Sequence, residues 1–204
     1  MQTIALFGTS ADPPTIGHQA ILAWLSYRFD GVAVWASDNP FKVNQTPLTH
    51  RMAMLRLLIY DLQRSRPNVQ FCPDLSQPRT IHTLEIAKRR WSAATFTFVV
   101  GSDLVPQLPT WYQIEDLLRE VNLLIVPRPS YPLSEAVLEA LRQRGARMAI
   151  ADLMGLDTSS TAYRKHKDTD GLTAAIKDYI HREHLYECED ASPKKQLQWQ
   201  TAQR

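Results

Sequence analysis

Short apolar runs alternate with helix-like stretches along most of the chain. Six runs are nearly continuous in β-branched and large apolar residues, which is typical of strands buried on both faces of a sheet. They cover residues 3–8, 32–37, 69–73, 96–101, 122–127 and 147–152. Apolar residues recur with helical spacing over residues 18–29, 49–63, 80–91, 114–121, 134–144 and 173–185. This alternation predicts βαβ units and a parallel sheet with helices on both faces.

The same pattern sets the domain organisation that we expect. Residues 1–188 form a single Rossmann-like α/β domain, and no internal repeat is visible. Residues 189–204 are polar and lack periodicity, so we predict a disordered C-terminal tail. In such a sheet, ligands bind at the carboxyl ends of the strands, where the strand order reverses. The loops that follow strands are therefore the places to look for chemistry.

Composition narrows the class of protein. The 204 residues are 44% hydrophobic and 22% charged, as in ordinary soluble globular proteins. A net charge of +2 is too small to argue for a nucleic-acid or membrane partner. Cys72 and Cys188 lie far apart without metal-ligand spacing, which suits a reducing cytoplasm. No secretion signal or membrane-spanning run is visible, so we expect a cytoplasmic protein. No carboxylate cage for an ion is evident in the sequence, so we expect no resident metal. A homo-oligomer remains open.

The first candidate loop is GTSADPPTIGH, residues 8–18. Gly8 ends the first strand, and Gly17 and His18 open the first helix. A helix N-terminus offers unpaired N–H groups and the positive end of the helix dipole, which suit a phosphate. The His18 ring and the Thr15 hydroxyl could donate to phosphate oxygens. The same residues also fit a plain strand–helix connection capped by Thr15, so both interpretations stay open.

The second candidate loop is DTSSTAYRKHK, residues 157–167. Ser159, Ser160 and Thr161 are all good N-cap residues, and Arg164 falls about one turn into the next helix. Three hydroxyls and an arginine that can bond in a bidentate fashion make a second anion site. The alternative is a capped helix with a solvated basic face. Two anion sites at one sheet edge would suit a triphosphate.

Both loops resemble signatures of the HxGH nucleotidyltransferase superfamily. Residues 8–18 are similar to its GGxFDPxHxGH motif, and SSTAYR (159–164) is similar to its ISSTxIR motif. Two departures stand out in this chain. Thr15 and Ala11 occupy the places of the family's first histidine and its phenylalanine, and Phe41 replaces the histidine that usually precedes Lys42. Thr15 can still donate a hydrogen bond, but it cannot carry charge.

Segments between the two motifs resemble the bacterial nicotinate-nucleotide adenylyltransferases in order and approximate spacing. They are NPFKVNQTPLTHRMAML (39–55), TIHTLE (80–85), FVVGSDLVPQLPTWYQIEDLL (98–118) and YIHREHLYE (179–187). The resemblance covers about residues 3–187. It implies an enzyme that joins the 5′-phosphate of nicotinate mononucleotide to the α-phosphorus of ATP and releases pyrophosphate. The product, nicotinate adenine dinucleotide, belongs to NAD biosynthesis.

Three alternatives to this activity stay open. The acceptor could be nicotinamide mononucleotide or phosphopantetheine, although the 80–85 segment and Trp111 favour an aromatic acceptor. The chain could also be a nucleotide sensor that has lost catalysis, with Thr15 as the mark of that loss. Retention of His18, Lys42, Ser160 and Arg164 together argues against the sensor.

The resemblance also implies roles for individual residues. His18, Lys42 and Arg164 would be catalytic, and Mg²⁺ would arrive with ATP. The ATP-binding residues would be Gly8, Thr9, Ser10, Thr15, Gly17, His18, Gly101, Asp103, Ser159, Ser160, Thr161 and Arg164. The mononucleotide-binding residues would be Lys42, Arg79, Thr80, Ile81 and Trp111. Core packing is the alternative for Trp111, and Asp12 could contact metal-bound water or ribose, or form an Asx-type turn before Pro13.

Overall fold

The computed structural model describes residues 1–39, 42–153 and 160–186. Its strands are β1 (Thr3–Thr9), β2 (Gly31–Ala36), β3 (Val69–Phe71), β4 (Thr95–Gly101), β5 (Asn122–Val126) and β6 (Arg147–Ile150). Its α-helices are α1 (Ile16–Ser26), α2 (Leu48–Gln63), α3 (Thr80–Arg90), α4 (Ile114–Glu120), α5 (Glu135–Gln143), α6 (Ser160–His166) and α7 (Ala174–Arg182). Two 3-10 helices, η1 (Pro73–Leu75) and η2 (Val105–Thr110), complete the described elements.

The strands form one parallel sheet in the order β3-β2-β1-β4-β5-β6. The order runs outward in one direction from β1 and in the other from β4, so the reversal lies between these two strands. Loops that leave the carboxyl ends of β1 and β4 therefore border the crevice where such folds bind ligands. The predicted Rossmann-like α/β fold is confirmed.

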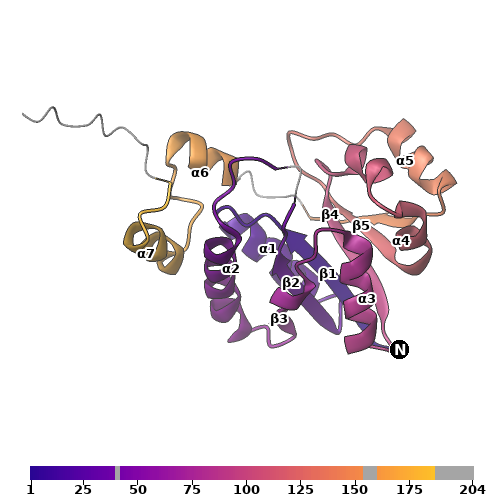
Figure 1. Cartoon of the computed structure of the whole chain (residues 1–204), viewed down its shortest axis with the longest axis horizontal. Coiled ribbons are helices and arrows are strands. Elements are labelled where there is room, and N and C mark those ends of the chain that lie inside the picture. The colour runs from indigo at the N-terminus through magenta and orange to yellow at the C-terminus, as the bar shows by residue number, and fades with distance from the viewer. Residues whose placement is uncertain (40–41, 154–159, 187–204) are drawn as a thin grey trace, which may run out of the picture.

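Helices cover both faces of the sheet, because side chains of β1 point alternately to one face and to the other. Ile4 and Leu6 are buried among residues of α3, α4 and α5, whereas Ala5 and Phe7 are buried among residues of α1, α2, α6 and α7. Successive side chains of a strand point to opposite faces, so a continuous apolar run supplies two cores at once. Figure 1 shows the two helical layers on either side of the sheet.

The edge strands depart from the sequence prediction. All six apolar runs were expected to be buried, but β6 is largely exposed to solvent, and Ile150 is 52% exposed. It is the last strand of the sheet and has only β5 beside it. At the other edge β3 ends at Phe71, because Pro73 begins η1 and cannot donate to a strand ladder.

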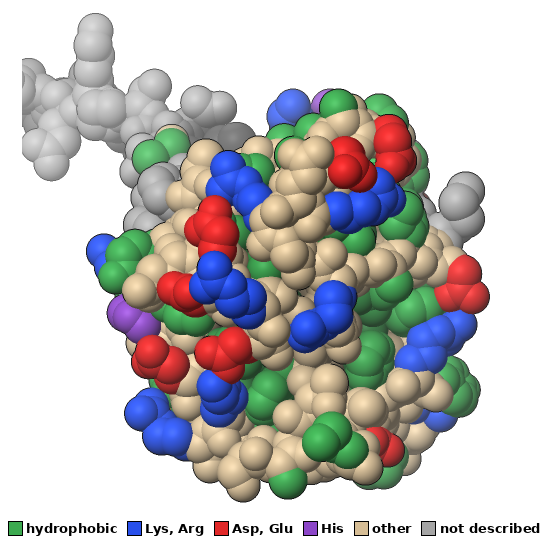
Figure 2. Space-filling model, turned by 90° about the vertical axis from the view of Figure 1, so that its right-hand side faces the viewer, with side chains coloured by type: hydrophobic (Ala, Val, Ile, Leu, Met, Phe, Trp, Pro, Cys, Tyr) green, Lys and Arg blue, Asp and Glu red, His purple; other side chains and the backbone are tan. Residues whose placement is uncertain are grey.

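The surface of the α3, α4 and α5 layer mixes charges of both signs, as Figure 2 shows for that side of the molecule. Arg142 pairs with Glu135 at 2.6 Å within α5, and Arg144 pairs with Glu115 of α4 at 2.8 Å. These pairs are substantially exposed, so each adds little stability. Among the described residues, no helix combines the length and the apolar character needed to cross a membrane.

Gly8 yields the first testable prediction, because it lies opposite Trp35 in the β1–β2 register. A Cβ atom at Gly8 would come within 2.7 Å of the Trp35 ring, which is buried in the core. We expect Gly8→Ala to lower the free energy of unfolding by about 1–3 kcal/mol, as overpacking does. Urea unfolding measures the change. In a Trp35→Leu background the cost should shrink, and an equal cost in both backgrounds would rule out this contact as the cause.

Candidate functional site

The two loops singled out in the sequence lie in direct contact. Ser160 at the start of α6 donates its hydroxyl to the carbonyl oxygen of Pro13 at 2.7 Å. Arg164, in the same helix, donates from Nη1 to the carbonyl oxygen of Asp12, and from Nη2 to the Thr161 hydroxyl at 3.3 Å. The predicted proximity of these loops is confirmed. Ser159 lies outside the described residues.

His18 is held as a neutral ring with a defined tautomer. The backbone N–H of Thr15 donates to His18 Nδ1 at 3.0 Å. Nδ1 therefore carries the lone pair, and the proton of the neutral ring sits on Nε2. The pKa of His18 is lowered from 6.5 to about 4, first by desolvation of the ring and then by the positive charges of Arg128 and Lys42. At neutral pH, Nε2–H is thus an uncharged hydrogen-bond donor.

Thr15 is the N-cap residue of α1 and is only 1% exposed. Its hydroxyl lies 2.9 Å from His18 Nδ1, so both its backbone and its side chain meet the same ring nitrogen. The helix-capping alternative describes this residue well, and a direct phosphate contact by Thr15 stays a prediction. The N–H of Ile16 donates to the carbonyl oxygen of Gly171 at 2.9 Å and is therefore already used within the protein.

Lys42 brings a positive charge into the same region. Its ammonium donates to the Ser10 hydroxyl at 2.7 Å. The pKa of Lys42 is lowered, first by partial desolvation and also by the cations Arg128, Arg164 and Arg51, while Asp103 acts in the opposite direction. Several cations gathered around one lysine form a place where a polyanion would be stabilised.

Arg128 belongs to this cluster, although the sequence analysis missed it. Its Nη1 lies 2.9 Å from Asp103 Oδ2, and its backbone N–H donates to the Ser102 hydroxyl at 2.9 Å. These contacts join the loops after β4 and β5. A Cβ on Gly101 would come within 2.4 Å of Asp103 Oδ1, which explains the glycine there. The available signal was position alone, since Arg128 directly follows a predicted strand.

Arg51 is a buried residue that contacts the loops after β1 and β2. It is 2% exposed and lies in the first turn of α2. Its Nη1 donates to the carbonyl oxygens of Ser10 at 3.0 Å and Ser37 at 2.8 Å, and its Nε donates to that of Thr46 at 2.8 Å. One buried guanidinium thus ties the loops after β1 and β2 together.

Asp12 points into the protein and is 2% exposed. Its Oδ1 accepts a hydrogen bond from the Tyr186 hydroxyl at 2.7 Å, and its Oδ2 accepts one from the Thr46 N–H at 3.4 Å. The suggested contact with metal-bound water or ribose does not agree with this placement, because the carboxylate has almost no exposed surface.

The residues proposed for the mononucleotide gather at the start of α3 and the end of η2. Arg79 is the N-cap residue of α3, and its guanidinium lies 3.9 Å from the centre of the Tyr112 ring. Trp111 is half-buried and packs edge to face on Phe98, with ring centroids 6.0 Å apart. Packing therefore accounts for part of the Trp111 surface. Ligand contacts by Arg79, Thr80, Ile81 and Trp111 stay predictions.

The described part of the chain contains no set of side chains that could bind a resident metal ion. No group of three or more His, Cys, Asp or Glu side chains is placed there to hold an ion. Asp103 is a carboxylate within the cation cluster, and it pairs with Arg128. A divalent cation at this site would need most of its ligands from a bound polyphosphate and from water.

Comparisons with known proteins agree with the geometry. The profile of the cytidylyltransferase-like family matches residues 6–166. A protein of Synechocystis sp., named as a probable nicotinate-nucleotide adenylyltransferase, is 43% identical over 197 residues, which cover 90% of this chain and 98% of that protein. The nicotinate-nucleotide adenylyltransferase of Bacillus subtilis is 27% identical, with 92% of this chain and 100% of that protein covered.

A solved structure has the same fold. It is the Plasmodium falciparum nicotinic acid mononucleotide adenylyltransferase complexed with NaAD, which superposes with a TM-score of 0.76 at 21% identity. The match covers 91% of this chain and 98% of that one.

The His18 environment predicts a specific pH dependence. The unfolded chain takes up the proton near pH 6.5, whereas the folded protein resists it until about pH 4, so protonation favours unfolding. Wild-type stability should therefore fall, relative to His18→Gln, as the pH drops from about 6.5 towards 4. Urea unfolding of both proteins at pH 7 and pH 5 measures this difference, and NMR titration reports the ring directly. A ring that titrates near 6.5 would contradict the desolvated environment.

Proposed function

The chain belongs to the cytidylyltransferase-like family, and we propose that it acts in that family as a nicotinate-nucleotide adenylyltransferase. It transfers the adenylyl group of ATP to nicotinate mononucleotide, which yields nicotinate adenine dinucleotide and pyrophosphate for NAD biosynthesis. The 43% identity to the Synechocystis relative over almost the full length of both chains supports this assignment.

The observation that carries the proposal is the meeting of two distant loops at one sheet edge. Ser160 and Arg164 bond to the carbonyl oxygens of Pro13 and Asp12, a few residues before His18. Lys42 and Arg128 lie close enough to His18 to lower its pKa. A neutral donor and several cations around one crevice match the needs of a polyphosphate whose charge shifts during transfer.

In the proposed reaction these groups align and neutralise, because no covalent intermediate with the protein is required. His18 donates from Nε2 to a phosphate oxygen of ATP. Thr161 and Arg164 hold the β- and γ-phosphates, which leave as pyrophosphate. Ser160 joins them when its hydroxyl turns from the Pro13 carbonyl oxygen to the phosphate. Lys42 bridges the reacting phosphates, and Arg128 adds positive charge beside it.

Mg²⁺ enters the proposal as part of the substrate. Since the described residues offer no cage for an ion, Mg²⁺ would be bound by the triphosphate and by water. Asp103 would remain available to contact that hydration shell, or to keep Arg128 and Lys42 oriented.

The acceptor site is proposed at the start of α3. The nicotinate carboxylate would meet N–H groups around Thr80 and Ile81, where the helix dipole favours an anion. Arg79 strengthens this preference for a carboxylate over a carboxamide. Trp111 would stack on the pyridine ring with the surface that Phe98 leaves open.

A direct assay tests the proposed function. With ATP and Mg²⁺, we expect nicotinate mononucleotide to support pyrophosphate release much faster than nicotinamide mononucleotide, because only the former carries the carboxylate. Coupled pyrophosphate detection measures both rates. Faster turnover of nicotinamide mononucleotide would reverse the acceptor assignment, and turnover of neither would leave the sensor.

Variants test the phosphate site. We expect His18→Ala and Arg164→Ala each to lower kcat by about 10²-fold, as the loss of one preorganised donor does in other enzymes. Arg128→Ala should lower kcat/KM for ATP by about tenfold or more, because a cation beside the polyphosphate is lost.

The matched control is Arg142→Ala, which removes an arginine from the exposed ion pairs of α5. It should leave steady-state kinetics unchanged. A fall of less than tenfold for both His18→Ala and Arg164→Ala would mean that the phosphates bind elsewhere.

A further inference from the structure

We propose that Tyr186 is a positioning residue of the ATP site, which acts through Asp12 on Arg164. The inference deepens the proposed function and rests on it. It assigns a role to the segment after α7, which lies far from the ATP site in the sequence but contacts the loop after β1 through Tyr186.

The contact between Tyr186 and Asp12 is a hydrogen bond to a buried charge. The hydroxyl donates to Asp12 Oδ1 at 2.7 Å, and the carboxylate is 2% exposed. Desolvation is the main cause that raises the pKa of Tyr186, so the hydroxyl keeps its proton and remains a donor. Hydrogen bonds to charged groups are stronger than neutral ones, and a buried carboxylate without them is costly.

Asp12 connects this bond to the phosphate site. Its carbonyl oxygen accepts a hydrogen bond from Arg164 Nη1, and its Oδ2 lies 4.0 Å from the same nitrogen. Oδ2 also accepts the Thr46 N–H, which belongs to the loop that carries Lys42. Tyr186 therefore fixes the residue on which Arg164 rests and to which the Lys42 loop is attached.

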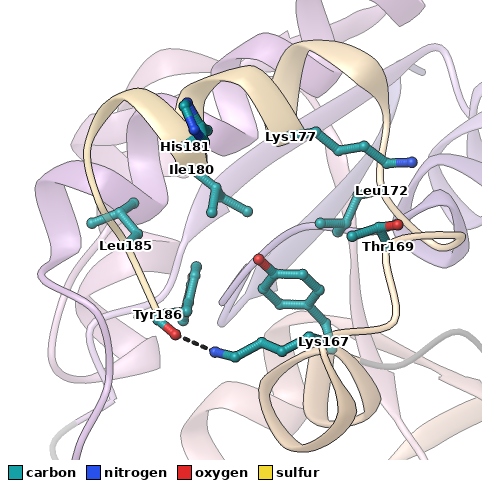
Figure 3. A pocket seen from close by; sticks show the side chains of 9 residues that line it. Lys167, Thr169, Leu172, Lys177, Ile180, His181, Leu185 and Tyr186 are labelled. Carbon is teal, nitrogen blue, oxygen red and sulfur yellow. Dashed lines mark hydrogen bonds between the residues drawn. The ribbon is translucent and has the colours of Figure 1, made fainter. Parts of the chain in front are cut away.

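Tyr186 is itself held by α6 and the residue that follows it. Lys167 donates from Nζ to the Tyr186 carbonyl oxygen (Figure 3). The rings of Tyr163 and Tyr186 pack edge to face, with centroids 5.4 Å apart and planes at 86°. Both tyrosines also line a cavity of about 320 Å³ between α6 and α7, whose lining includes Leu172 and Ile180. The hydroxyl bond to Asp12 adds a directional contact to this ring packing.

The test compares Tyr186→Phe with Tyr179→Phe. Tyr179 hydrogen-bonds His50 Nδ1 at 3.0 Å and ties α7 to α2, and the bond does not involve Asp12 or Arg164. We expect Tyr186→Phe to lower kcat/KM for ATP by roughly tenfold, with KM for nicotinate mononucleotide changed by less than about twofold. Tyr179→Phe should leave both parameters near wild type. Equal kinetic effects of the two variants would overturn the proposal.

A double-mutant cycle shows whether Arg164 carries the effect. In an Arg164→Ala background, Tyr186→Phe should cost less than about twofold, because the group that it positions is gone. An undiminished tenfold loss in that background would overturn the proposed route through Arg164. Melting temperatures of all variants separate a general loss of stability from a specific effect on ATP.

Binding of a non-hydrolysable ATP analogue separates this inference from the proposed reaction. Calorimetry should show weaker binding to Tyr186→Phe than to Tyr179→Phe, even if nicotinate mononucleotide proved not to be the acceptor. Equal affinity of the two variants for the analogue, together with equal kcat/KM for ATP, would overturn the role of Tyr186 and leave the adenylyltransferase assignment intact.

Discussion

Two buried charges determine the shape of the phosphate site. Asp12 and Arg51 are each 2% exposed, and a buried charge is tolerated only when hydrogen bonds replace its water. Arg51 obtains them from carbonyl oxygens in the loops after β1 and β2, and Asp12 from Thr46 and Tyr186. The loops cannot move far without leaving one of these charges unsatisfied, so they present a firm base to a ligand.

The loops held by Asp12 and Arg51 keep several positively charged side chains close together despite their mutual repulsion. Lys42, Arg128 and Arg164 carry like charges, and the pKa of Lys42 is lowered first by partial desolvation and then by Arg128, Arg164 and Arg51. Asp103 offsets part of the repulsion through Arg128. His18 adds a donor without adding charge, since its pKa of about 4 keeps the ring neutral. Thr15, which stands at the position of a histidine in the motif that the sequence resembles, caps α1 and contacts His18.

The fold could be predicted from the sequence because each strand and helix has its own local pattern of apolar and polar residues. Among the described residues, all six strands and all of the α-helices were located, since apolar period and turn residues act over neighbouring positions, and only the two short 3-10 helices were not. The exposure of β6 was missed because burial of an edge depends on the whole sheet. The loops of His18 and Arg164 were found through their motifs. Arg51, Arg128 and Tyr186 were missed because their partners lie between 5 and 174 residues away, and no local pattern encodes such contacts.

The hydrogen bond between Asp12 and Tyr186 joins residues that are synthesised at very different times. Asp12 leaves the ribosome 174 residues before Tyr186, so the nascent chain lacks that bond while the whole stretch between them is made. Until Tyr186 has been made, the Asp12 carboxylate lacks this hydrogen bond, and a carboxylate without such a partner is more stable in water than buried. The phosphate pocket can therefore take its final form only after Tyr186 has been synthesised.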